Sequence, residues 1–194
     1  LTYTNQGYPS VAFPFGAALV ASYAKKILGD KIEYELFKYP NDFKNYAEKK
    51  KPKIICFTNY SWTFDLSYQF SKKIKTKYPD TIVIFGGPHY PNEISTQTAF
   101  LKSYPAIDFY IKGEGELGFV ELFENLEKCN FSVNEFKKKK IRSGNCHYVI
   151  DDEYKVSENV YTLIDENNPD LELPEYHLVS HLQFAIMVGF VNKF

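Results

Sequence analysis

The residues best placed for chemistry in this 194-residue chain lie in four short loops rich in glycine, amide and hydroxyl groups. The loops are TYTNQGYPS (2–10), TNYSW (58–62), GGPHYP (86–91) and GEGELG (113–118). Each follows a segment that predicts a β-strand. In open α/β sheets, ligands bind beyond the carboxyl ends of the strands. We therefore expect the four loops to form one binding site.

The GGPHYP loop follows the continuous apolar run 82–85, which is typical of a strand covered on both faces of a parallel sheet. Gly86 and Gly87 then remove all side-chain bulk at the end of that strand. A tight turn would explain the pair, and so would a ligand lying over the strand ends.

The GEGELG loop matches the G-x-G-x-x-G pattern of dinucleotide-binding proteins, between a predicted strand and a predicted helix. It follows the last strand of the series, however, whereas that fingerprint belongs to the first. Glu114 and Glu116 also put negative charge where a pyrophosphate would sit. These carboxylates are better suited to capping the helix, which disfavours nucleotide binding here.

The TNYSW loop joins four hydrogen-bonding residues to the only tryptophan, Trp62. It could line a pocket for a large, partly apolar ligand that carries amide groups. It could equally be an ordinary helix start, with Ser61 or Thr63 as the N-cap and Trp62 in the core.

Metal and nucleophile signatures are absent from the sequence. The three cysteines are far apart and the four histidines have no ligand partners at metal-binding spacing, so we expect neither metal ligands nor catalytic residues. The sparse cysteines suit a reducing compartment, and we expect a cytoplasmic protein.

Charge and hydropathy exclude two classes of partner. The net charge is −1 and Arg142 is the only arginine, so a nucleic-acid interface is disfavoured. No apolar stretch reaches the length that a membrane span needs.

The loops must be positioned by alternating strands and helices. Apolar runs predict strands at 31–39, 53–58, 81–86 and 107–113, the first at an edge. Helical spacing predicts three helices, with the stripes Phe15, Leu19, Tyr23 and Ile27; Leu66, Phe70, Ile74 and Tyr78; and Phe119, Leu122, Phe123 and Leu126. This alternation predicts an α/β fold with a doubly wound, Rossmann-like parallel sheet.

We expect three segments along the chain. Residues 1–128 form the α/β domain, 129–160 carry a small β-hairpin appendage, and 161–194 form a linker and C-terminal helix leading toward an absent domain. The start of the chain offers only a stub of strand where a doubly wound sheet needs its first central strand.

Three stretches resemble the N-terminal cobalamin-binding domain of cobalamin-dependent radical SAM enzymes. They are FPFGAALVASYAKK, ICFTNYSWTFDLSYQFSKKIKTKYPDTIVIFGGPHYP and IDFYIKGEGELGFVELFENL. The resemblance covers roughly residues 1–128 and rests on the order of the aromatic loop, Gly-Gly-Pro and Gly-Glu-Gly-Glu.

The resemblance implies a flavodoxin-like sheet of strand order 2-1-3-4-5, with the corrin ring across its C-terminal edge. The glycine pair would let the cofactor's nucleotide tail pass beneath the ring. The implied cofactor-binding residues are Thr4, Asn5, Gln6, Gly7, Thr58, Asn59, Tyr60, Gly86, Gly87, Pro88, Gly113, Glu114, Gly115 and Glu116.

Two departures from known patterns qualify this assignment. The D-x-H-x-x-G motif of other cobalamin domains is absent, which predicts cobalt without a protein histidine below it. The CxxxCxxC of the radical SAM half is also absent, so no iron–sulfur cluster is expected on this chain.

The chain therefore looks like a fragment or truncated form that catalyses nothing alone, whose missing partner would be a radical SAM domain. Full-length relatives would be enzymes such as methyltransferases. A nucleotide- or nucleotide-sugar-binding Rossmann-like protein and a ligand-free interaction module remain alternatives.

Overall fold

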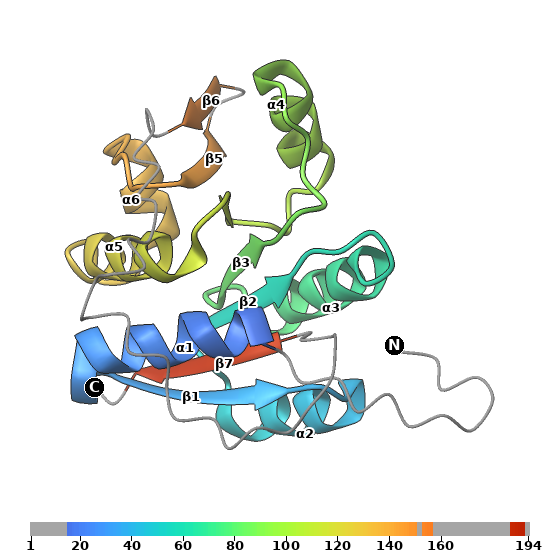
Figure 1. Ribbon diagram of the computed structural model, residues 1–194, viewed down its shortest axis with the longest axis vertical. Coiled ribbons are helices and arrows are strands. Elements are labelled where there is room, and N and C mark those ends of the chain that lie inside the picture. Colours follow the sequence, from blue (N-terminus) through green and yellow to red (C-terminus); the bar gives the residue numbers. More distant parts are fainter. Residues whose placement is uncertain (1–14, 151–152, 157–186, 193–194) are drawn as a thin grey trace.

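The computed structural model describes residues 15–150, 153–156 and 187–192, and these form a seven-stranded sheet with helices on both faces (Figure 1). The helices are α1 (Phe15–Leu28), α2 (Pro40–Lys50), α3 (Phe64–Lys77), α4 (Ile94–Ser103), α5 (Gly115–Glu127) and α6 (Val133–Lys138), with a short 3-10 turn η1 (Gly29–Lys31). The strands are β1 (Ile32–Phe37), β2 (Ile54–Thr58), β3 (Ile82–Gly86), β4 (Phe109–Ile111), β5 (Cys146–Ile150), β6 (Glu153–Val156) and β7 (Met187–Asn192). The predicted α/β class is confirmed.

The strand order differs from the expected 2-1-3-4-5. It is β1-β7-β2-β3-β4-β5-β6, in which β2, β3 and β4 are parallel and β7 runs antiparallel to both its neighbours. The place that the expected order gives to the first strand is thus filled by β7, where the sequence predicts a helix. Its run MVGFVN is apolar enough for a central strand, and its backbone pairs with the facing edges of β1 and β2.

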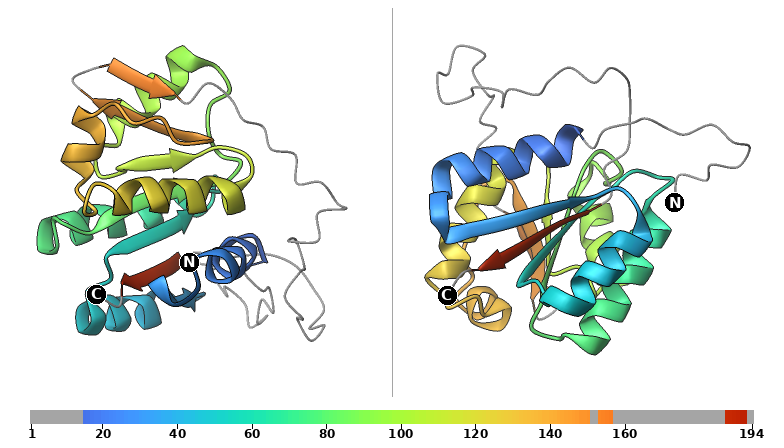
Figure 2. Two further views of the ribbon diagram at one scale, coloured as in Figure 1. Left: turned by 90° about the vertical axis from the view of Figure 1, so that its left-hand side faces the viewer. Right: turned by 90° about the horizontal axis from the view of Figure 1, so that it is seen from below.

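Side chains of the central strands alternate between two buried layers. In β3, Ile82 and Ile84 join a core with α1 and α5, whereas Val83 and Phe85 join a core with α2, α3 and α4. Figure 2 shows the sheet lying between these helix layers. The continuous apolar run in the sequence is therefore explained by burial on both faces, as predicted.

Helix α1 turns a different face inward from the one predicted. Its buried positions are Ala17, Ala18, Ala21, Ala24 and Leu28, whereas Ile27 of the predicted stripe is 44% exposed. Small side chains allow α1 to approach α5 closely. A Cβ on Gly115 would lie only 2.8 Å from Val20 Cγ2.

The predicted hairpin is confirmed as β5–β6, but it extends the main sheet, because β5 pairs with β4. Phe136 and Tyr148 of this region belong to the same core as α1 and α5. The division at 128 and 160 stays a prediction, and most of 161–194 lies outside the described residues. No helix in the described part is long and apolar enough to cross a membrane.

Asp108, just before β4, links β3 to α3 through a hydrogen bond and an ion pair. Its Oδ2 accepts a hydrogen bond of 2.8 Å from the Val83 N–H and lies 2.5 Å from Lys75 Nζ. We expect Asp108→Ala to lower the free energy of unfolding by about 2 kcal/mol, because a buried N–H loses its acceptor. Asp108→Asn should lose less, since its amide oxygen can still accept. Urea denaturation of both variants tests this, and equal losses would contradict it.

Candidate functional site

The carboxyl ends of three parallel strands meet at one edge of the sheet. Thr58, the last residue of β2, is level with Gly86 of β3, and Gly86 is level with Ile111 of β4. The loops that follow these strands therefore share one rim. Three of the four loops that the sequence groups into one site therefore lie at the same edge of the sheet, and the loop at 2–10 lies outside the described residues.

A cavity of about 250 Å³ opens at this rim. Its apolar base includes Cys56, Ile84 and Ile111 from the strands, and α1 and α5 form its sides. Eight of the predicted site residues line it, namely Thr58, Tyr60, Gly86, Gly87, Gly113, Glu114, Gly115 and Glu116. The arrangement suits a ligand with an apolar body and a few polar groups.

The remaining predicted residues are placed differently. Asn59 and Pro88 belong to the same loops but do not line the cavity, and Asn59 is fully buried behind it. Residues 4–7 lie outside the described part of the chain.

The contribution of α1 was missed by sequence reasoning. Gly16, Ala17 and Val20 line the cavity across from the strand ends. The signal that could have identified them is the small-residue face of this helix, which leaves room beside the sheet.

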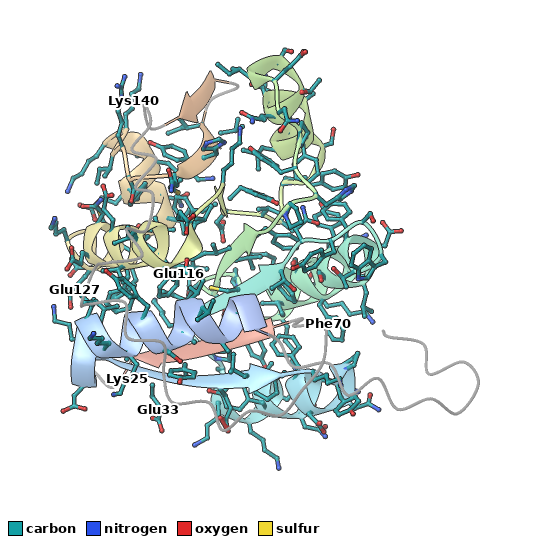
Figure 3. All side chains as sticks on the ribbon, viewed as in Figure 1. Lys25, Glu33, Phe70, Glu116, Glu127 and Lys140 are labelled. Atoms are coloured by element: carbon teal, nitrogen blue, oxygen red, sulfur yellow. The ribbon has the colours of Figure 1, made fainter. Side chains whose placement is uncertain are left out.

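Glu114 and Glu116 lie at the start of α5 and are the only carboxylates among the described residues that line the cavity. Figure 3 shows Glu116 between α5 and α1. Partial burial raises the pKa of Glu116 and the Glu114 charge raises it further, while the backbone N–H groups of Glu116 and Gly115 act in the opposite direction. The Glu116 carboxylate therefore lies against the first N–H groups of α5, where a phosphate would need to bind, as the sequence predicts for this residue. The predicted capping by Glu114 is wrong, because Glu114 is the N-cap residue but its side chain makes no capping hydrogen bond.

Cys56 is the cysteine among the lining residues. Burial raises the pKa of its thiol, so the thiol stays protonated at neutral pH and is a poor nucleophile and metal ligand. Among the residues that the structure describes, no three His, Cys, Asp or Glu side chains gather as a metal site.

The aromatic loop before α3 is both a helix start and part of the cavity. Thr63 is the N-cap residue, although its side chain makes no capping bond to the helix. Tyr60 lines the cavity and stacks on Trp62, with ring centroids 5.0 Å apart. Trp62 is 56% exposed, so the alternative that places it in the core is wrong.

Gly86 and Gly87 meet different surroundings. Among the described residues, a Cβ on Gly86 would have a single neighbour within 4 Å, Ile111 O at 3.4 Å, so a side chain there would enter the cavity. Gly87 has a φ of +130°, and a Cβ there would lie 2.8 Å from Asn59 O and 2.9 Å from Asn59 N. Gly87 is thus required for the contact between two loops, whereas Gly86 keeps the cavity open.

Comparison with known proteins identifies the fold family. Residues 7–123, more than half of the chain, match the family model described as the B12 binding domain. The chain belongs to the B12-binding domain family. Cobalamin is accordingly the cofactor of this domain, and the recognition made from the sequence is confirmed.

Relatives of this B12-binding domain are methyltransferases. It is 33% identical over 72 residues to the cobalamin-dependent radical SAM methyltransferase TokK of Streptomyces tokunonensis, covering 37% of this chain and 10% of that protein. It is 31% identical over 71 residues, with the same coverages, to 2-(S-pantetheinyl)-carbapenam-3-carboxylate methyltransferase of Streptantibioticus cattleyicolor. It is 30% identical over 120 residues to the uncharacterized methyltransferase PH0819 of Pyrococcus horikoshii, covering 59% of this chain and 25% of that protein.

The cavity fits cobalamin in part. Its volume of about 250 Å³ is below the range of roughly 300–1,000 Å³ typical of drug-sized ligands, and cobalamin is larger than those. The B12-binding domain can therefore enclose one portion of the cofactor, while the rest must lie outside over the strand ends. The open space above Gly86 is compatible with an extended portion entering there.

Proposed function

We propose that the chain binds cobalamin at the carboxyl ends of β2, β3 and β4 and presents it to a radical SAM domain. The observation that carries this is the cavity at those strand ends in a chain whose family binds B12. The corrin ring would lie across the rim, and the nucleotide tail would enter beside Gly86. Bound cobalamin would supply a cobalt centre able to carry a methyl group.

The residues of the chain hold and orient the cofactor in this proposal. Thr58 and Tyr60 offer hydrogen-bonding groups from one loop, and Gly113 to Glu116 close the site from another. Glu114 and Glu116 can accept hydrogen bonds from amide N–H groups, which the corrin ring carries at its edge. Residues 4–7 are proposed to complete the rim. Cobalt would have no protein histidine below it, since D-x-H-x-x-G is absent.

The catalytic half is a further part of the proposal. The matched segment spans only a tenth to a quarter of the relatives' lengths. All three relatives are named as methyltransferases, and one of them is named as a cobalamin-dependent radical SAM enzyme. We therefore propose that this domain does not catalyse methyl transfer itself and that a radical SAM domain acts on the substrate.

Incubation with hydroxocobalamin tests the binding. After desalting, we expect a visible absorption spectrum of corrinoid that co-migrates with the protein at about one equivalent. NAD and a nucleotide sugar, offered as competitors, should not displace it. A colourless protein after desalting, or displacement by either competitor, would contradict the proposal and favour the interaction module or the nucleotide-binding protein.

Trp62 gives an independent readout of the same event. It is the only tryptophan, and it stacks on Tyr60, which lines the cavity. We expect hydroxocobalamin to quench its fluorescence in a saturable way, because the corrin absorbs where tryptophan emits. Free tryptophan at the same absorbance is the control, and an identical linear decrease in both samples would mean no binding near Trp62.

A further inference from the structure

Tyr110 is a buried residue of β4 that reaches the site without lining the cavity. Its ring belongs to the core on the side of α2, α3 and α4, while its hydroxyl donates a hydrogen bond of 2.7 Å to the Gly87 carbonyl. Burial raises the pKa of this hydroxyl, so it stays protonated and can donate at neutral pH. The hydroxyl donates its single proton to Gly87 O. Its oxygen therefore accepts a hydrogen bond from Asn59 Nδ2, which lies 3.1 Å away.

Asn59 joins the loop after β2 to the loop after β3. Its N–H donates to Gly86 O at 2.6 Å, and its carbonyl accepts from the His89 N–H at 3.1 Å. Its side-chain Nδ2 donates to the His89 carbonyl as well as to Tyr110. A Cβ added to Gly87 would lie 2.8 Å from Asn59 O and 2.9 Å from Asn59 N, so the two loops pack closely at Gly87.

Tyr90 holds the Tyr110 ring in place. The two rings stack with centroids 3.7 Å apart and an angle of 11°, and the Tyr90 hydroxyl lies 3.3 Å from His147 Nδ1. The hydroxyl of Tyr110 is thus fixed by packing before any ligand arrives. The carbonyls of Gly86 and Gly87 are both engaged by this network, which fixes how Gly86 faces the cavity.

We infer that Tyr110, supported by Asn59 and Tyr90, is a positioning residue that orders the glycine turn for cofactor binding. The inference rests on the proposed function. When the turn is already ordered in the free protein, binding does not have to order it. Removing the Tyr110 hydroxyl is therefore expected to lower the affinity for the cofactor, although this hydroxyl makes no contact with the cofactor itself.

Tyr110→Phe tests this, with Tyr148→Phe as the matched control. Tyr148 is also a buried tyrosine whose hydroxyl donates to a backbone carbonyl, Ile141 O at 3.0 Å, but it lies outside the cavity lining. Tyr110→Phe loses two hydrogen bonds, to Gly87 O and from Asn59 Nδ2, whereas Tyr148→Phe loses one, so a larger loss of stability is expected for Tyr110→Phe. The free energy of unfolding is therefore measured in urea for both variants, and affinity is compared under conditions in which both are folded. We expect hydroxocobalamin to bind roughly tenfold more weakly to Tyr110→Phe and unchanged to Tyr148→Phe.

Cobinamide, which lacks the nucleotide tail, distinguishes a local effect on the glycine turn from a general loss of structure in the variant. Its affinity should change less than that of hydroxocobalamin in Tyr110→Phe, because the proposed function places the tail beside this turn. If Tyr110→Phe does not fold, Tyr90→Leu removes the stacking ring and should weaken hydroxocobalamin binding in the same direction. Unchanged affinity, or equal weakening in both tyrosine variants, would overturn the inference. Failure of the wild type to bind would instead overturn the proposed function.

Discussion

Gly86→Val is expected to weaken cobalamin binding by about tenfold or more while leaving the domain folded. Within the part of the chain that the structure describes, a Cβ at this position meets only Ile111 O within 4 Å, and its added methyl groups would enter the cavity. Gly86 ends β3 and is not among the residues with positive φ, so a β-branched residue is compatible with its backbone. Equilibrium dialysis against hydroxocobalamin measures the effect.

Gly86→Ala provides the graded control for this experiment, because one methyl group occupies less of the cavity. Its affinity should fall between those of the wild type and Gly86→Val. The free energy of unfolding, measured in urea, should stay close to the wild-type value for both. Wild-type affinity in Gly86→Val would mean that no part of the cofactor enters this cavity.

Gly87→Val is expected to lower the free energy of unfolding by about 3 kcal/mol or more. Its φ of +130° is unfavourable for any L-residue with a side chain, and the Cβ would lie 2.8 Å from a backbone oxygen of Asn59. That oxygen cannot move alone, because it accepts the hydrogen bond from His89 N–H. Urea denaturation beside Gly86→Val gives the comparison.

Gly87→Ala should also be clearly destabilised, since the close contact begins at the Cβ. If Gly87→Val unfolds like the wild type, the loops do not pack as the structure shows. Measurements of affinity and of the free energy of unfolding therefore distinguish the roles of the two glycines. Loss of binding is expected at Gly86, and loss of stability at Gly87.

The central strands and their loops could be predicted from the sequence because the local signals are strong. The runs ending at Thr58 and Gly86 are apolar on both faces and are followed directly by polar or glycine residues. Parallel strands bring such ends to one edge, so the shared rim followed from the pattern. The stripe Phe119, Leu122, Phe123 and Leu126 is buried as predicted.

The position of β7 could not be predicted, because pairing between distant segments leaves little trace in the local sequence. Its apolar run is compatible with a buried helix as well as a strand. The burial of α1 was misjudged for a related reason. The buried face of α1 consists mainly of alanines, and Val20 of this helix packs against Gly115 of α5, whereas Ile27 of the predicted stripe is exposed.

Helices α2, α4 and α6 had no prediction. A signal existed for α2, since Pro40 occupies its first turn and Phe43 and Ala47 are its buried positions. Tyr110 was read only as part of a strand. Its role depends on where its hydroxyl meets Gly87, which is a property of the assembled loops and not of its own neighbours in sequence.

Hydrogen–deuterium exchange with and without hydroxocobalamin tests the central claim most directly, because it reports binding and location together. We expect slower exchange in the segments 58–64, 86–90 and 113–118, and unchanged exchange in β5 and α6 on the far side of β4. An unchanged exchange pattern at saturating hydroxocobalamin, or protection confined to segments away from the cavity and its rim, such as β5 and α6, would contradict a cofactor site at this edge of the sheet.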